Sequence, residues 1–385
     1  MRIEEAWLTE APLVTIFDAF EAAGHRVYLV GGAVRNALLG EPVGDLDLAT
    51  DAVPEQMMQL AEAAGIKAIP TGIGHGTVTL VLQGTPFEIT TFRQDVETDG
   101  RHATVDFTDD ITRDARRRDF TMNALYVGAD GTVIDPLGGL PDVMARRVRF
   151  IEDAGTRIRE DYLRILRFFR FHAQYGGARG MDSDGLAAVA DNLDGLDGLA
   201  RERVGSEVLR LLAAPDPAPA VAAMDRVGVL TRLLPGADSR ALAPLIHLEA
   251  EAGSIGPDSV RRLAALGGED AQGHLRLSNA DSARLDVLKG GLGDMTSPEV
   301  LGYLNGAEAA RDILLLRAAI FEQPLDPGAL AAANHGARQR FPIVAADLMP
   351  AYQGAALGAR LRALEARWIA SRFTLGRDDL LEESA

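Results

Sequence analysis

The spacing of apolar residues changes near residue 150, and this change limits the folds open to a chain of 385 residues. Upstream of it, short runs of β-branched and aromatic residues bounded by Gly, Pro or Asp predict strands. These runs lie at 26–32, 76–84, 86–93, 123–135 and 146–152. Segments with helical spacing at 33–40 and 54–65 are interspersed with them. The first part of the chain is therefore predicted to be a mixed domain of strands and helices.

Downstream of about residue 152 the apolar residues recur every three or four positions, as in amphipathic helices. Stretches rich in Gly, Pro and Asp, such as 235–244 and 252–259, separate these periodic segments. No repeat of fixed period is present. The second part is thus predicted to be all-α, in more than one packed unit, and the whole chain belongs to the α+β class.

Composition excludes several classes of protein. A net charge of −17 argues against a general nucleic-acid coat, although arginines concentrate between residues 113 and 170 and predict one locally basic face. Without cysteine the chain can form no disulfide and no thiolate site. The acidic N-terminus does not resemble a signal peptide. No apolar run approaches the roughly 18 residues of a membrane helix. We therefore expect a soluble, cytoplasmic protein without membrane contact.

A glycine turn follows the first predicted strand. Gly31 and Gly32 come directly after an apolar run and before a short helix, so that backbone N–H groups meet a helix N-terminus, where phosphate binds well. Arg35, one turn into the helix, can add a charge-assisted contact. The spacing is not that of a dinucleotide fingerprint. The turn predicts a phosphate site of another kind.

Two aspartates follow this helix. In an extended chain Asp45 and Asp47 project to the same side, and two adjacent carboxylates favour a hard cation such as Mg²⁺ between them. Such pairs also cap turns, and they occur in glycosyltransferases and phosphatases. Glu88, an acid within a predicted strand, either forms a salt bridge at the strand edge or completes a three-carboxylate site for nucleotidyl transfer.

Several motifs occur in a recognisable order between residues 25 and 212. They read GGAVRN, GDLDLAT, EITTFR, RRRDFTMNAL, DPLGGLPD, REDYLRILRFFRF and RERVGSEVLRLL. This series resembles the bacterial class II CCA-adding enzymes and the related poly(A) polymerases, within the polymerase-β-like nucleotidyltransferase superfamily. The resemblance implies a catalytic head with a five-stranded sheet at 1–150, a helical neck at 151–212, and a helical body and tail that bind tRNA at 213–385.

The resemblance also implies an activity, the template-independent addition of C, C and A to the 3′ end of tRNA from CTP and ATP, with release of pyrophosphate. Asp45 and Asp47 match the residues that bind Mg²⁺, and Glu88 stands where the family has its third acid. The implied partners are the tRNA 3′ end and the two nucleotides, with no obligate protein partner.

Four residues of RRRDFTMNAL match the family element that handles ribose and phosphate, namely Arg117, Arg118, Asp119 and Asn123. An arginine cluster of this kind can also be a solvated face. The series GGAVRN departs from the family at one position, because Asn36 stands where the family usually has Asp. Any role there that needs a carboxylate is therefore in doubt.

The resemblance implies that the segment REDYLRILRFFRF selects the incoming base. On one helix Asp161 and Arg164, three residues apart, would share a face, one offering acceptors and the other donors. Cytosine and adenine present an amine beside an unprotonated ring nitrogen, whereas uracil and guanine present the reverse. The pair therefore matches C and A, in agreement with the role that the resemblance implies, although a surface ion pair would look the same. Arg167 continues the stripe toward the triphosphate, and Phe171 is predicted to belong to the core.

The polar segment 94–115 resembles the loop by which CCA-adding members switch from CTP to ATP, and it disfavours an enzyme that adds only C and C.

Three other functions remain open. A poly(A) polymerase or an A-adding tRNA nucleotidyltransferase is the nearest alternative. A non-catalytic RNA-binding relative would not need the three acids. A glycosyltransferase or phosphatase would leave the Asp161/Arg164 pair without a role.

Overall fold

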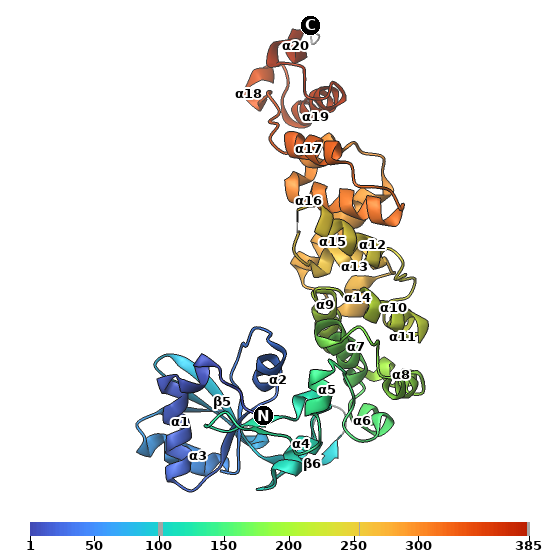
Figure 1. Ribbon diagram of the computed structural model, residues 1–385. Coiled ribbons are helices and arrows are strands. Elements are labelled where there is room, and N and C mark those ends of the chain that lie inside the picture. The colour runs from blue at the N-terminus through green and yellow to red at the C-terminus, as the bar shows by residue number, and fades with distance from the viewer. Residues whose placement is uncertain (99–102, 254, 383–385) are drawn as a thin grey trace. The chain divides into compact units, whose positions relative to one another are not determined.

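The computed structural model describes residues 1–98, 103–253 and 255–382 (Figure 1). The chain separates into two compact units, Met1–Leu233 and Leu234–Ala385. Strands occur in the first unit and helices in both, which confirms the α+β class. The division into head, neck and body at residues 150 and 212 stays a prediction.

The first unit is built on a mixed sheet of seven strands. Its strand order is β3 (Lys67–Gly72), β4 (Thr77–Leu82), β5 (Thr85–Thr91), β2 (Leu48–Thr50), β1 (Val27–Val30), β8 (Tyr126–Val127) and β9 (Val133–Ile134). Among the pairings described, β2 and β5 run parallel and the other neighbours run antiparallel. A separate two-stranded sheet joins β6 (Arg93–Thr98) to β7 (Ala103–Phe107). Residues 99–102 of the predicted switching loop lie outside the described residues.

The expectation of five strands was wrong for local reasons. The run 123–135 forms a hairpin of two short strands, β8 and β9, instead of one strand. The run 146–152 forms no ladder strand in the described structure, since Arg147 and Arg149 turn to the buried Asp142 and only Phe150 makes a β-bridge. Two strands gave too weak a signal in the sequence. β2 has three residues, too few for a visible alternation, and β3 is a largely exposed edge strand.

Five helices accompany the sheet: α1 (Ala11–Ala22), α2 (Gly32–Leu39), α3 (Pro54–Ala63), α4 (Ile111–Arg116) and α5 (Leu140–Met144). α1 and α3 contact each other and the sheet (Figure 1). On α1 the side chains of Leu13, Ile16, Phe17 and Phe20 are buried, at the spacing of one helix face. α2 starts directly after β1 and ends at Gly40, whose left-handed φ of 69° closes the helix.

The remainder of the first unit is helical. Its helices are α6 (Ala154–Glu160), α7 (Leu163–Tyr175), α8 (Ser183–Ala190), α9 (Arg201–Leu212), α10 (Ala218–Arg226) and α11 (Val229–Leu233). The single helix that was predicted to carry both Asp161 and Arg164 is broken between α6 and α7. Asp161 is extended there, with φ −153° and ψ 105°, and its Oδ1 accepts a hydrogen bond from the Leu163 N–H at 3.1 Å. This side-chain cap competes with helix continuation and starts α7 anew.

The second unit contains no β-strand among its described residues. Its helices are α12 (Leu242–Glu251), α13 (Ser259–Leu266), α14 (Ala271–Leu275), α15 (Asn279–Gly293), α16 (Pro298–Ile320), α17 (Pro327–Gly336), α18 (Ala345–Leu348), α19 (Gly354–Ala370) and α20 (Arg377–Glu382). α16 is kinked at Gly306. Throughout the described part of the chain, every helix is either too short or too polar to cross a membrane.

Candidate active site

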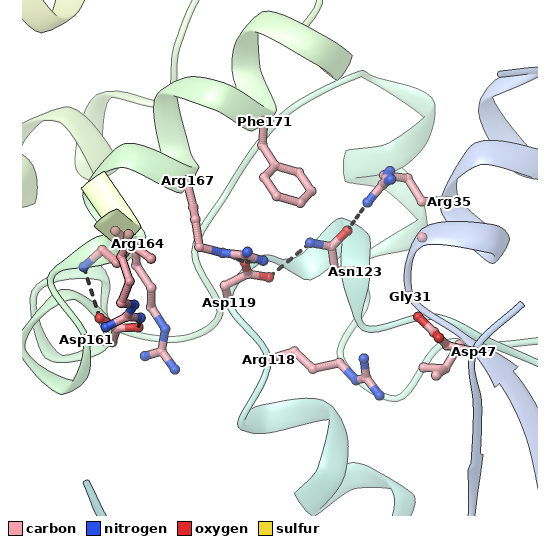
Figure 2. A pocket seen from close by; sticks show the side chains of 14 residues that line it. Gly31, Arg35, Asp47, Arg118, Asp119, Asn123, Asp161, Arg164, Arg167 and Phe171 are labelled. Atoms are coloured by element: carbon pink, nitrogen blue, oxygen red, sulfur yellow. Dashed lines mark hydrogen bonds and ion pairs between the residues drawn. The ribbon is translucent and has the colours of Figure 1, made fainter. Parts of the chain in front are cut away.

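A cavity of about 520 Å³ lies in the first unit, between the end of β1, the segment after α4, and helices α7 and α9 (Figure 2). It brings together ten of the thirteen site residues expected from the sequence. These ten are Gly31, Gly32, Arg35, Asp47, Arg118, Asp119, Asn123, Asp161, Arg164 and Arg167. The lining is completed by Val30, Leu163, Phe171 and Arg203.

The glycine turn forms one wall of the cavity. Gly31 caps α2 with φ 73° and ψ −119°, a conformation that L-residues rarely adopt, so the turn requires glycine. A Cβ atom on Gly31 would lie 3.5 Å from Nη1 of Arg118. The guanidinium of Arg118 therefore lies beside the exposed backbone of the turn, and Figure 2 shows it extended toward Asp47 and Gly31.

Arg35 is more deeply buried than an arginine side chain that is free to bind phosphate. Only 5% of its surface is exposed, and its guanidinium stacks on the Tyr175 ring of α7, with Cζ 3.9 Å from the ring centre. Nη1 donates to Oδ1 of Asn123 at 2.5 Å. Burial lowers the pKa of Arg35, while Tyr175 and Asp119 oppose this effect. Arg35 thus links α2 to α7 from the wall of the cavity.

Asn36 has two partners of opposite kind. Its Oδ1 accepts from Nη2 of Arg35 at 2.8 Å, and its Nδ2 donates to the carbonyl of Pro42 at 2.7 Å. A carboxylate could accept from Arg35 but could not donate to a carbonyl. Asn36 therefore fixes the loop that leads from α2 to Asp45 and Asp47, which is a role that the more usual Asp would not fill.

A buried hydrogen-bonded chain crosses the floor of the cavity. Oδ2 of Asp119 accepts from Nε of Arg167 at 2.7 Å, and its Oδ1 accepts from Nδ2 of Asn123 at 3.0 Å. Burial alone would raise the pKa of Asp119, but the charge of Arg167 and the hydrogen bonds from Asn123 and the Phe120 N–H hold it below its usual value. Because Asn123 also accepts from Arg35, the chain connects α7 to α2 (Figure 2).

Asp161 and Arg164 lie on the opposite side of the cavity, but they do not share a helix as predicted. Asp161 lies in the break before α7, and Arg164 lies in its first turn. Arg164 donates through Nη1 to Oε2 of Glu160 at 2.5 Å and to the carbonyl of Arg157 at 2.7 Å. Asp161 accepts from Nη2 of Arg203, on α9, at 2.7 Å. Each member of the pair is thus oriented by its own ionic partner.

The three acids lie around the start of β2. Asp45 and Asp47 precede this strand, and the pairing of Leu48 with Ile89 brings Glu88, on β5, next to Asp47. Although solvent reaches Asp47, partial burial raises the pKa of its carboxyl, and the charges of Glu88 and Asp45 raise it further, against Arg118. Within the described residues no group of three or more acidic or histidine side chains is close enough to hold a metal ion. The expected three-carboxylate metal centre stays a prediction.

Three expected site residues lie outside the cavity lining, whereas Phe171 and Arg203 lie in it and were not expected there. Asp45 and Glu88 are exposed beside the cavity, and Arg117 turns away to Oδ1 of Asp114 at 2.8 Å. Phe171 is buried, as predicted, but it also lines the cavity, four residues after Arg167 on the same helix face. Arg203 had no detectable relation to Asp161 in sequence, since only the packing of α9 on α7 brings them together.

Parts of the chain are similar in sequence to known proteins. The Poly A polymerase head domain matches residues 27–149, and the probable RNA and SrmB-binding site of polymerase A matches residues 181–240. The human mitochondrial CCA tRNA nucleotidyltransferase 1 is 45% identical over 202 residues, which are 52% of this chain and 46% of that protein. The CCA-adding enzyme of Geobacillus thermodenitrificans is 41% identical over 215 residues, 55% of this chain and 52% of that protein.

The match in structure extends further than the match in sequence. The Bacillus stearothermophilus CCA-adding enzyme, solved in complex with CTP, aligns over 94% of both chains with a TM-score of 0.76 and 28% identity. By sequence, in contrast, the chain covers only about half the length of the relatives named above. The fold is therefore similar to that of a solved CCA-adding enzyme. Within the chain, residues 27–149 and 181–240 are thus similar to domains of poly(A) polymerases, and the sequence resembles CCA-adding enzymes over about half of its length.

Proposed function

We propose that this protein adds C, C and A to the 3′ end of tRNA, from CTP and ATP and without a nucleic-acid template, and releases pyrophosphate. One observation carries the proposal. A single cavity has a glycine turn and Arg118 on one side, and an acceptor and a donor, Asp161 and Arg164, on the other. A nucleoside triphosphate has the matching polarity, with phosphates at one end and a hydrogen-bonding base at the other.

The phosphate end of the nucleotide would lie at the glycine turn. The first N–H groups of α2 have no partner within the helix, and the helix dipole adds positive potential at the same end. Arg118 supplies a fixed positive charge beside Gly31. Arg167 lies between this wall and the Asp161/Arg164 side, and through Asp119 it joins the buried chain that orients Asn123. Asp119 and Asn123 are proposed to contact the ribose.

The base end of the nucleotide would face Asp161 and Arg164. Asp161 accepts the amine of cytosine or adenine, and Arg164 donates to the neighbouring ring nitrogen. Uracil and guanine would place a carbonyl against the carboxylate and a ring N–H against the guanidinium. Each buried polar group left unpaired costs roughly 1–3 kcal/mol. The protein itself would therefore act as the template for C and A.

The acids suit a divalent cation. Asp45, Asp47 and Glu88 offer only oxygen ligands, which Mg²⁺ prefers. Partial burial raises the pKa of Asp47, and the charges of Glu88 and Asp45 raise it further, a repulsion that a cation would relieve. We propose that Asp45 and Asp47 bind Mg²⁺, with Glu88 as the third acid. When bound, the metal would lower the pKa of the attacking 3′-hydroxyl and neutralise charge on the triphosphate. The protein's own part is to align that hydroxyl with the phosphate beside Gly31 and Arg118.

The tRNA partner and the location complete the proposal. The helical part after residue 212 would bind tRNA, and the match to an RNA-binding region at 181–240 supports an RNA substrate. The solved relative named above was crystallised with CTP, which supports CTP as one nucleotide. A cytoplasmic site of action is compatible with the cysteine-free sequence.

Stepwise incorporation tests this function. Purified protein, Mg²⁺ and a tRNA transcript lacking its last three nucleotides are incubated with CTP alone, with ATP alone, and with both. We expect two CMP additions with CTP alone and one further AMP when ATP is present. Long A tails would indicate a poly(A) polymerase, and failure to use CTP would indicate an A-adding enzyme.

A further inference from the structure

Two arginines of the cavity, Arg35 and Arg118, lie at the glycine turn. Among the described residues, only Arg118 of these two has a terminal nitrogen without a hydrogen-bond partner. Its Nε donates to the hydroxyl of Tyr126 at 3.3 Å and its Nη2 donates to Asp114 at 3.0 Å. Nη1 has no hydrogen-bond partner in the part of the chain that the structure describes, and it lies 3.5 Å from the position that a Cβ atom of Gly31 would take. The orientation of Arg118 therefore depends on the groups that hold its other two nitrogens.

Asp114 is the centre of those groups. It lies on α4, only 1% of its surface is exposed, and its carboxylate is fully engaged. Oδ2 accepts from Arg118 and from the Tyr126 hydroxyl at 2.7 Å, while Oδ1 accepts from Nε of Arg117 at 2.8 Å. Burial would raise the pKa of Asp114, but the two arginines and Tyr126 hold it well below its usual range. The group therefore stays ionised at any working pH.

The geometry also explains why a carboxylate is needed at this position. A long arginine side chain loses rotamer freedom when it is fixed, and a buried charge-assisted hydrogen bond offsets that cost in advance of ligand binding. The Tyr126 ring adds a second restraint, since Cζ of Arg118 lies 5.4 Å from its centre. With two of its nitrogens held, Arg118 can direct only Nη1 along the turn.

We infer that Asp114 is a positioning residue, which holds Arg118 so that Nη1 meets the triphosphate at the glycine turn. The inference rests on the proposed function only in taking a nucleoside triphosphate as ligand. Asp114 does not itself line the cavity, so it acts through Arg118, which does.

The test measures binding and not turnover. Affinities for CTP, for inorganic tripolyphosphate and for cytidine are measured by calorimetry with excess Mg²⁺ in both solutions. Asp114→Asn keeps the size of the side chain and removes its charge. We expect this variant to bind tripolyphosphate and CTP roughly fivefold to twentyfold more weakly, as for loss of one charge-assisted contact. Cytidine, which lacks phosphate, should bind as before.

A double-mutant comparison separates positioning from general damage. Arg118→Ala alone should lower the affinity for tripolyphosphate, and adding Asp114→Asn to it should cause no further loss of affinity. The matched control is Asp142→Asn, because Asp142 is likewise buried, accepts from two arginines and one hydroxyl, and lies outside the cavity lining. That control should leave tripolyphosphate affinity unchanged.

The outcomes separate this inference from the proposed function. Independent, additive losses in the double variant, or equal losses in Asp142→Asn, would overturn the positioning role even if the protein adds CCA. Loss of CCA addition in the wild type with an intact binding pattern would overturn the function alone. If Asp114→Asn does not fold, Tyr126→Phe takes its place, since it removes one donor to Asp114 and leaves all charges. A Tyr126→Phe protein with unchanged tripolyphosphate affinity would contradict the inference.

Discussion

Nη2 of Arg203 lies 2.7 Å from Oδ2 of Asp161, and this ion pair ties α9 to the break between α6 and α7. Oδ1 of the same aspartate caps the first turn of α7. Asp161 is thereby fixed in an extended conformation beside the cavity, although it belongs to no helix. The acceptor proposed to read the base is thus oriented by a residue 42 positions further along the chain.

Replacing Arg203 should therefore reduce the fidelity of nucleotide choice more than its rate. In Arg203→Ala the Asp161 carboxylate loses its ionic partner and keeps the weaker hydrogen bond from the Leu163 N–H. We therefore expect misincorporation of UMP and GMP relative to CMP and AMP to rise roughly fivefold to tenfold. Single-turnover incorporation with each nucleotide measures the ratio. Arg210→Ala, on the same helix with a 65% exposed side chain, is the control. An equal decrease in the incorporation rate of all four nucleotides would mean that Arg203 only stabilises the packing of the helices.

Arg164 is predicted to contribute the donor half of base choice. Arg164→Lys keeps the charge but loses the rigid fork that Glu160 and the Arg157 carbonyl hold in place. We expect the preference for C and A over U and G to fall on the order of tenfold. Competition between labelled CTP and UTP measures it, with the exposed Arg159→Lys on α6 as control. Unchanged discrimination would refute the template argument.

The chemistry of this site was easier to predict from sequence than its geometry. Residue type alone indicates the chemistry of the glycines after an apolar run, of the paired aspartates and of the Asp/Arg pair. Gly31, Asp47 and Arg164, one residue from each of these features, do line one cavity. The helix break at Asp161 was missed because apolar spacing continues through it, while a side-chain cap decides against continuation.

Other features depend on contacts far apart in the chain. Asp114 and Arg203 act through side chains that only packing brings close, so no spacing rule finds them. The strands β2 and β3 escaped prediction because a strand of three residues has no visible period and an exposed edge strand needs none. Asn36 was noted as a departure, but its role became clear only with the Pro42 carbonyl as its partner.

The ionised carboxylate of Asp47, which is proposed to bind the metal, should lower the stability of the fold when no metal is bound. An acid whose pKa is raised by folding binds its proton more tightly in the folded state, so its ionised form destabilises the fold above that pKa and has no effect well below the unfolded value. The pKa of Asp47 is raised from 3.8. In EDTA at neutral pH, Asp47→Asn should therefore raise the Tm slightly, on the order of 1–3 °C, and the difference should vanish as the pH falls below 3.8.

The same variant should respond differently to metal. Mg²⁺ should raise the Tm of the wild type and leave that of Asp47→Asn almost unchanged, because only the wild type offers the charged ligand. Nucleotide transfer should fall by about a thousandfold or more, since the metal's contribution to catalysis is lost, while tRNA binding measured by filter retention stays. A variant that still transfers nucleotides, or that gains as much from Mg²⁺ as the wild type, would remove Asp47 from the proposed metal site.

The second unit contains a buried ionic cluster that should control its stability. Arg261 and Arg262 are 1% and 2% exposed, and both donate to Glu249, on α12, at 2.8 Å. Nη1 of Arg261 also donates to Asp312, on α16, at 3.0 Å. Removing one partner from such a cluster leaves a buried charge uncompensated, which typically costs about 3–5 kcal/mol.

Glu249→Ala should therefore lower the free energy of unfolding of the second unit by about 3–5 kcal/mol. The chain has two tryptophans, Trp7 in the first unit and the buried Trp368 in the second, so urea unfolding followed by fluorescence in a Trp7→Phe background reports on the second unit. Glu251→Ala, on the same helix with a 59% exposed side chain, should change stability by less than about 0.5 kcal/mol. Equal effects of the two variants would show that the cluster contributes no more than a surface pair, whereas a large effect of Glu249→Ala with unaltered CTP binding would assign it to the second unit alone.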